Sequence, residues 1–300
     1  MSKNKKTIWL YIILTFILTW TFELLVVCPR YAGMFSSDTA EKATATVLVS
    51  ACMFIPALCA LLTRLVLRDW DDCRLRLSMT GHVKYYVLGW VGPLALTVIG
   101  AALWFVLNPE EFVLTTPMSV LHLPTAVCWL VFLVTLLAAP LLNLVACFGE
   151  EWGWRGFLMP RLCREHTFNV SALLTGLLWG LWHAPIIAMG HNYRVIWGED
   201  PVGKVIAAIA AMIVFCVVAS FFFGYLSEKA KSVWPAALAH GCMNGVAGLG
   251  YMFSAAMADS AANLPYNTFV GPAPMGIVGG FAFVIVAVWI AMKMWNRKVQ

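Results

Sequence analysis

The chain has 300 residues, of which 61% are hydrophobic and only 12% are charged, and its mean hydropathy is +0.81. Soluble globular domains carry about 25% charged residues, so this composition excludes an ordinary soluble domain and predicts an integral membrane protein. The formal net charge of +5 is explained by the placement of basic residues at one side of a membrane, and we expect no nucleic-acid partner.

Apolar stretches long enough to cross a bilayer as helices, which takes about 20 residues, occur along the whole chain. In order they cover residues 8–27, 43–67, 85–107, 125–148, 171–189, 202–226, 233–252 and 275–294. The first follows a basic N-terminus but is too long for the apolar region of a signal peptide. We therefore predict an all-α, polytopic membrane bundle of about eight transmembrane helices, with residues 1–300 forming a single transmembrane domain.

The orientation of the bundle follows from its basic residues, which membrane proteins keep on the cytoplasmic side. If the N-terminus is cytoplasmic, the only basic residues on the outside are Arg30, Lys42, Arg194 and Lys204, out of 20 Lys and Arg in total. This distribution and the even number of spans predict that both termini are cytoplasmic. We expect an integral protein of the bacterial plasma membrane, surrounded by the lipid bilayer.

Few polar residues are available inside the predicted bundle. Every aspartate lies in a predicted loop, which excludes a paired-aspartate intramembrane protease, and the sequence contains neither a GxSxG nor an HExxH motif. The polar residues that remain in or beside the spans are Glu23, Glu150, Glu151, Asn143, His183, His240 and Asn244. Because ionisable groups are expensive to place in a membrane, this small set predicts a functional site.

Helical spacing arranges most of these residues in pairs, since residues four apart share a helix face. The pairs are Glu151 with Arg155, Trp179 with His183, and His240 with Asn244. Glu150 is turned about 100° away from Glu151 on a helix of 3.6 residues per turn. We therefore expect Glu151 to form an ion pair and Glu150 to stay available. Glu23 stands alone in the first span and is interpreted as a buried hydrogen-bond partner or gating residue.

These motifs resemble those of the CPBP family, the intramembrane endopeptidases related to type II CAAX prenyl proteases and to bacteriocin self-immunity proteins. The family has EExxxR, then an aromatic residue four positions before a His, then HxxxN, on successive segments of an eight-helix bundle. All three motifs occur here in order within residues 125–252, the expected catalytic core. Trp179 stands where the family more often has Phe. The resemblance implies an endopeptidase that acts on membrane-embedded or lipid-anchored peptides, with the motif Glu and His acting on water.

The residue types also suit peptide hydrolysis. Glu150 is the candidate base that activates a water molecule, because a partly desolvated carboxylate is a better base than a solvated one. His183 could hold the same water or pass a proton to the leaving amine, and His240 with Asn244 could stabilise the oxyanion. The residues expected to support this site are Glu151, Arg155 and Trp179. No cofactor is needed.

The sequence leaves other interpretations open. Glu150, His183 and His240 could bind a zinc ion with one position open for water, although there is no HxxxH pair and Asn244 is a poor zinc ligand. The cluster could instead serve recognition in a non-catalytic immunity or regulatory protein. A transporter is disfavoured, because the chain lacks charged residues for a relay along several helices.

The depth of the site sets a geometric condition. The predicted spans place Glu150 near the cytoplasmic surface, whereas His183 lies about 18 Å deep at a rise of 1.5 Å per residue. These residues can meet only in a recess. Pro140 would kink the fourth span, so we expect a water-filled cavity that opens to the cytoplasmic side.

Overall fold

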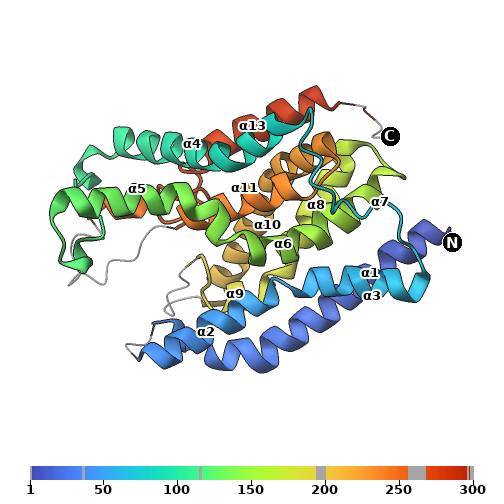
Figure 1. Ribbon diagram of the computed structural model, residues 1–300. Coiled ribbons are helices and arrows are strands. Elements are labelled where there is room, and N and C mark those ends of the chain that lie inside the picture. The colour runs from blue at the N-terminus through green and yellow to red at the C-terminus, as the bar shows by residue number, and fades with distance from the viewer. Residues whose placement is uncertain are drawn as a thin grey trace.

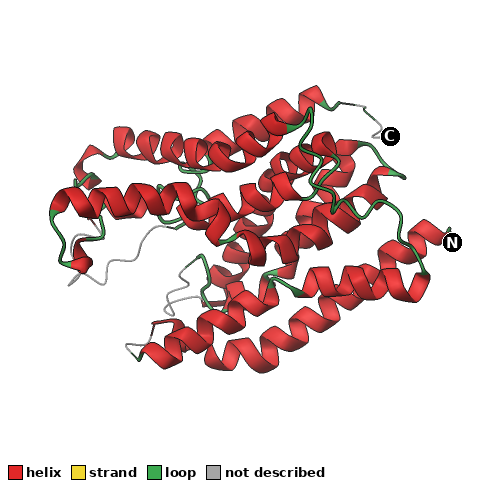
Figure 2. Cartoon of the chain, viewed as in Figure 1, coloured by secondary structure: helices red, strands yellow, loops and turns green. Residues whose placement is uncertain are grey.

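The protein is helical throughout the part that the structure describes. The computed structural model describes residues 2–35, 38–114, 117–193, 201–255, 268–295 and 297. Within these ranges the only β-type pairing is an isolated antiparallel bridge between Phe112 and Ser254 (Figure 2). The predicted all-α class is confirmed.

Short breaks divide the chain into many helices, which lie roughly along one direction (Figure 1). The main helices are α1 (Lys3–Phe22), α2 (Thr39–Cys52), α3 (Ile55–Leu67), α4 (Val83–Leu107), α5 (Thr125–Leu142), α6 (Leu144–Gly153), α7 (Met159–Cys163), α8 (Phe168–Trp182), α9 (Ala184–Ala188), α10 (Pro201–Ala230), α11 (Trp234–Val246) and α13 (Phe281–Lys293). Two π-helical turns, Glu23–Val27 and Trp154–Leu158, continue α1 and join α6 to α7. The 3₁₀-helical segments are Cys28–Phe35, Pro109–Glu111, Ser119–Leu121 and Gly250–Phe253.

Several helical stretches have the length and composition needed to cross a membrane. They are Lys3–Met34, Thr39–Leu67, Val83–Leu107, Thr125–Cys163 and Val202–Ala230, and two shorter apolar helices are Phe168–Trp182 and Phe281–Lys293. These helices confirm an integral membrane protein. The number of eight crossings and the cytoplasmic location of the termini stay predictions.

The fourth span predicted from the sequence, 125–148, is shorter than the helical stretch that the structure contains there. Its helical stretch runs from Thr125 to Cys163, over 39 residues, and is interrupted only at Asn143. Pro140 lies just before this interruption, where its ring removes a backbone donor and disfavours a regular helix. Glu150 therefore lies well inside a long helical stretch, and its place at the membrane edge stays a prediction.

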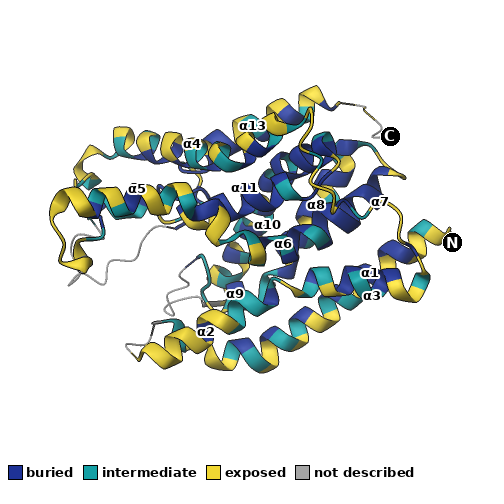
Figure 3. Ribbon diagram, viewed as in Figure 1, coloured by how far each residue is buried: buried dark blue, intermediate teal, exposed yellow. Residues whose placement is uncertain are grey.

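The central helices pack closely and bury most of their surface, whereas the outer helices expose apolar side chains (Figure 3). Helix α8 packs along α10, and α11 lies against α4, α5 and α6. Glycines allow two of these close approaches: a Cβ atom at Gly176 would lie 2.5 Å from Val217 Cα, and one at Gly241 would lie 2.7 Å from the Pro140 carbonyl oxygen. Exposed apolar residues such as Leu130 on α5 provide the surface that faces lipid.

Gly176→Ala tests the close packing of α8 against α10. Its Cβ atom would meet main-chain atoms of α10, which cannot move aside like a flexible side chain, so we expect a loss of about 1–3 kcal/mol of stability. The measurement is the thermal unfolding of the protein purified in detergent. Gly248→Ala is the matched control, because nothing lies within 4 Å of that position. Equal melting temperatures for the two variants would contradict the packing.

Candidate active site

A buried ion pair stands at the centre of the bundle. Arg155 Nη1 lies 2.8 Å from Glu151 Oε1, and both side chains are 0% exposed. The guanidinium also lies over two aromatic rings, 4.2 Å from the Trp179 ring centroid and 5.3 Å from that of Phe223. The predicted Glu151–Arg155 pair is present. Its two charges compensate each other where solvent cannot, and the aromatic rings add cation–π attraction.

The same carboxylate also holds a histidine from a distant part of the chain. His240 Nδ1 lies 2.9 Å from Glu151 Oε1. Because an ionised carboxylate can only accept hydrogen bonds, Nδ1 carries the proton and donates to Glu151. This bond leaves His240 Nε2 for other partners. The spacing of four residues predicted the ion pair with Arg155, but this second contact was not predicted from the sequence.

Glu150 is also buried, with only 3% of its surface exposed, and it accepts a hydrogen bond of 2.7 Å from Trp179 Nε1 to its Oε2. The Trp179 ring packs against both motif histidines, at 5.3 Å from His240 and 5.8 Å from His183 between ring centroids. Trp179 thus contacts the residues of all three motifs. A phenylalanine at this position would keep the ring contacts but would have no N–H to donate to Glu150.

His183 is held at a break between two helices. Helix α8 ends at Trp182, and Pro185 lies within the first turn of α9, so His183 occupies the junction. Its Nδ1 lies 2.8 Å from the Trp179 carbonyl oxygen. A carbonyl oxygen only accepts, so Nδ1 is again the protonated nitrogen and Nε2 is left for other partners. Both motif histidines therefore have the same tautomer in their neutral forms.

The fourth candidate, Asn244, lies one turn beyond His240 on α11, and its Nδ2 contacts Cys147 Sγ at 3.5 Å. Asn143, at the break between α5 and α6, donates to the carbonyl oxygens of Ala139 and Gly241. The Asn143 side chain therefore connects the break between α5 and α6 to α11, at the residue that follows His240.

One cavity collects the candidate residues. Glu150, His183, His240 and Asn244 all line a cavity of about 450 Å³, so the recess expected from the sequence is present. Two further ionisable residues line the cavity, and neither was predicted from the sequence to be part of the site. The first is Glu23, which is 1% exposed and whose Oε2 has no hydrogen-bond partner in the described part of the chain. The second is His191, which contacts the Tyr31 hydroxyl at 3.0 Å between Nδ1 and oxygen.

The cavity is bordered by two connections. Its lining includes Met34, in the 3₁₀ segment after α1, and Asn192, in the connection after α9. Which side of the membrane the cavity faces depends on the orientation of the protein, and the predicted opening to the cytoplasmic side stays a prediction.

The described side chains do not form a metal cluster. Within the described ranges, no group of three or more His, Cys, Asp and Glu residues is placed to hold a metal ion. Glu150, His183 and His240 share the cavity, but three of their polar atoms already contact Trp179 and Glu151. These contacts leave the Nε2 atoms of both histidines for other partners, so the alternative zinc site stays a prediction.

The fold and the cavity together define a helical membrane protein with a buried carboxylate–histidine site inside the bundle. Residues 126–246 match the model of the family described as Type II CAAX prenyl endopeptidase Rce1-like. The chain also resembles CAAX prenyl protease 2 of Methanococcus maripaludis, at 39% identity over 53 residues, which cover 18% of this chain and 20% of that relative. The matched segment contains all three motifs, and the resemblance inferred from them is confirmed.

Separate changes to the two neighbouring glutamates test their different environments. Glu151→Gln leaves Arg155 as a buried charge without its counter-ion, so we expect a loss of about 3–5 kcal/mol of stability. Glu150→Gln keeps an oxygen that accepts from Trp179, so we expect a much smaller change. Chemical unfolding of the two variants in detergent gives the comparison. A Glu150→Gln protein as unstable as Glu151→Gln would contradict this division.

Proposed function

We propose that the protein is an intramembrane endopeptidase that hydrolyses peptide bonds with a water molecule activated by Glu150. The observation that supports this most directly is the shared cavity, in which a buried carboxylate and two histidines meet inside a membrane bundle. The family segment 126–246 supports the same reaction class. The proposed catalytic core is 125–252, which carries all three motifs.

In the proposed reaction, Glu150 removes a proton from water while the water oxygen attacks the carbonyl carbon of the peptide bond. The unprotonated Nε2 of neutral His183 accepts a hydrogen bond from the second water proton and orients the nucleophile. When the C–N bond breaks, the proton held by Glu150 passes to the leaving amine. The carboxylate is restored, and no group outside the cavity is consumed.

The developing oxyanion needs hydrogen-bond donors on the other side of the carbonyl. His240 and Asn244, one turn apart on α11, are the proposed donors. Since His240 Nδ1 already donates to Glu151, His240 can donate to an oxyanion only through a protonated Nε2. Asn244 can contribute its side-chain amide if it releases the contact with Cys147.

The supporting residues fix this arrangement. Glu151 orients the His240 ring, Arg155 balances the charge of Glu151, and Trp179 fixes one oxygen of Glu150. These are positioning residues, since none of them needs to touch the reacting atoms. The proposed substrates are membrane-embedded or lipid-anchored peptides, and the proposed location is the bacterial plasma membrane.

Removal of the base or the water-orienting histidine tests the mechanism. We expect Glu150→Gln and His183→Ala each to lower peptide cleavage by about 10²–10⁴-fold, the usual contribution of a general base. Purified protein in detergent is incubated with a mixture of apolar peptides, and new peptide ends are counted by mass spectrometry. Glu110→Gln is the matched control, because that glutamate is exposed and remote from the cavity.

The same experiment tests the non-catalytic alternative. If the protein is an immunity or regulatory protein that only binds its partner, the wild type and Glu150→Gln will produce the same small number of new ends. Folding of each variant is checked by its thermal transition. Cleavage that persists undiminished in a folded Glu150→Gln variant would disprove the assignment of Glu150 as the base.

A zinc-dependent version of the reaction is tested by metal removal. We expect the rate of cleavage to be unchanged after exhaustive chelation, because the proposed nucleophile is activated by Glu150 alone. The measurement combines the cleavage rate with metal analysis of the same preparation. Loss of cleavage on chelation, with recovery on addition of zinc, would instead assign Glu150, His183 and His240 as metal ligands.

A further inference from the structure

Glu23 is a carboxyl group in the active-site cavity that the proposed mechanism does not use. It is only 1% exposed, and its Oε2 has no hydrogen-bond partner in the described part of the chain. Burying a carboxyl group without a partner is costly, and an ionisable side chain inside a membrane bundle indicates a functional site. A ligand that brings a hydrogen-bond donor to this group removes that cost.

The packing of α1 against α8 determines where the Glu23 side chain lies. Trp182 Nε1 donates to Thr19 Oγ1 at 2.7 Å, and Trp20 Nε1 donates to the Trp182 carbonyl oxygen at 3.2 Å. Glu23 follows Thr19 by four residues and therefore shares its helix face. Trp182 directly precedes His183, and both of these residues line the cavity together with Glu23. The two tryptophan contacts thus hold α1 with Glu23 beside the helix break at His183.

The helix becomes irregular at the same residue. The segment Glu23–Val27 forms a π-helical turn that continues α1. Such turns are rare, because their hydrogen bonds run from residue i to i+5, and they frequently occur at functional sites. The turn packs against α9, the helix that follows the break at His183. The backbone of Glu23 is therefore held by contacts with the helices on both sides of that break.

The described lining of the cavity contains acidic side chains without basic ones to balance them. Glu23 and Glu150 line it together with three histidines, and no lysine or arginine of the described ranges does so. Arg155 pairs with Glu151 instead. Glu150 accepts a hydrogen bond from Trp179, whereas Glu23 accepts none from the described side chains. The cavity is therefore complementary to a ligand that brings a positive charge to Glu23.

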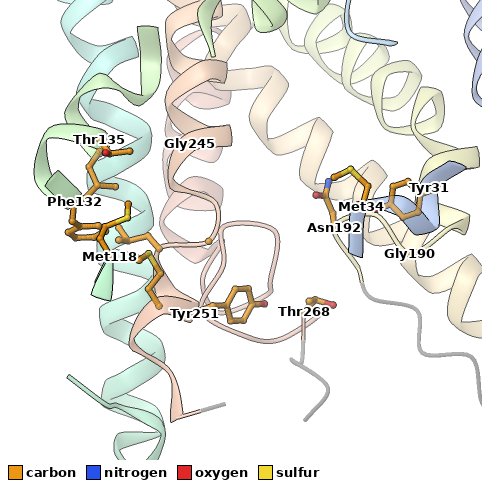
Figure 4. A pocket seen from close by; sticks show the side chains of 14 residues that line it. Tyr31, Met34, Met118, Phe132, Thr135, Gly190, Asn192, Gly245, Tyr251 and Thr268 are labelled. Atoms are coloured by element: carbon orange, nitrogen blue, oxygen red, sulfur yellow. The ribbon is translucent and has the colours of Figure 1, made fainter. Parts of the chain in front are cut away.

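The acidic groups are confined to this cavity. A neighbouring cavity of about 510 Å³ shares Met34 and Asn192 with it. The side chains around this second space, among them Phe132 and Met118, are apolar or neutral (Figure 4). None of its described lining residues is acidic, basic or a histidine. Of the two cavities, only the one that contains Glu23 is complementary to a cation.

We propose that Glu23 binds a cationic nitrogen group of the substrate, either the side chain of a lysine or arginine close to the scissile bond or a free amino terminus. This inference rests on the proposed peptidase function and adds a substrate class to it. Glu23 is then a specificity-determining residue, which contacts the substrate away from the bond that is cleaved.

The chemistry of the cavity suits such a group. A hydrogen bond between a cationic donor and a carboxylate is shorter and stronger than one between neutral groups. The hydrocarbon part of a lysine or arginine side chain can pack against the apolar part of the lining, which includes Met212 and Phe215. Folding has already removed solvent from Glu23, so binding does not incur the full cost of desolvating this carboxyl group again.

Paired peptides test the preference for a cation. The substrates are otherwise apolar peptides in which each position in turn carries lysine or norleucine, a neutral residue with a similar hydrocarbon chain. Their ends are blocked, and one further pair has a free or an acetylated amino terminus. The value of kcat/KM is measured for each pair with wild type, Glu23→Gln and Glu23→Asp in detergent. Glu41→Gln is the matched control, because that glutamate is exposed on α2.

We expect wild type and Glu41→Gln to cleave the cationic member of one pair about 10- to 100-fold faster, the factor for a hydrogen bond to a charged group. Glu23→Gln should lose this preference, and Glu23→Asp, which keeps the carboxylate on a shorter side chain, should keep part of it. The pair that shows the preference assigns the cation to a side chain or to the amino terminus. Equal cleavage of every pair by wild type, or an undiminished preference in a folded Glu23→Gln variant, would overturn the proposal.

Binding separates this inference from the peptidase function. The affinities of fluorescently labelled lysine and norleucine peptides are compared in Glu150→Gln and in the double variant Glu150→Gln/Glu23→Gln, by fluorescence anisotropy. We expect the single variant to bind the lysine peptide about 10- to 100-fold more tightly and the double variant to bind both peptides equally. This binding preference without any cleavage by wild type would support the role of Glu23 and contradict only the peptidase function. Cleavage by wild type with no such preference would contradict only the role of Glu23.

Discussion

The arrangement of the site depends on how a membrane bundle compensates a buried negative charge. The Glu151 carboxylate has no access to solvent, so its charge must be balanced by groups brought to it by the fold. Arg155 does so from the next turn of the same helical stretch, and His240 does so from α11. Trp179, from α8, lies over the Arg155 guanidinium and donates to Glu150. Three helical segments are thus brought together around one carboxylate, and the orientation of the His240 ring follows directly from it.

Interruptions of the helices create the space in which chemistry can take place. Helices α5 and α6 are separated at Asn143, and α8 and α9 are separated at His183, both beside a proline. At the second break the His183 amide does not donate to the Trp179 carbonyl oxygen, and the His183 side chain contacts that oxygen instead. In a bilayer, backbone of this kind is tolerated only where protein or water surrounds it. The breaks and the cavity are therefore two aspects of one structural feature.

The spacing of four residues predicted the Glu151–Arg155 pair, because that contact lies within one helical stretch and depends only on helix geometry. The recess was also predicted, since Glu150 and His183 could not otherwise meet. The bond between His240 and Glu151 could not be predicted, because these residues belong to different helices whose rotation and depth depend on packing. Glu23 was recognised as a buried polar residue, but its place in the same cavity as Glu150 depends on how α1 packs against the rest of the bundle. Hydropathy also did not show that the polar run after Phe148 continues as a buried helical stretch to Cys163, because burial there depends on contacts with other helices.

By itself the sequence determined the class of the protein and the chemistry available to it. The scarcity of charge requires a lipid environment, the asymmetry of basic residues favours one orientation, and the three motifs lie in the segment that matches the family model. Each of these depends on local composition or on spacing within one helix. The tertiary structure decided which side chains share the cavity and which histidine contacts Glu151. Those properties arise from contacts between helices far apart in the chain, and their geometry is set by close packing that no single segment encodes.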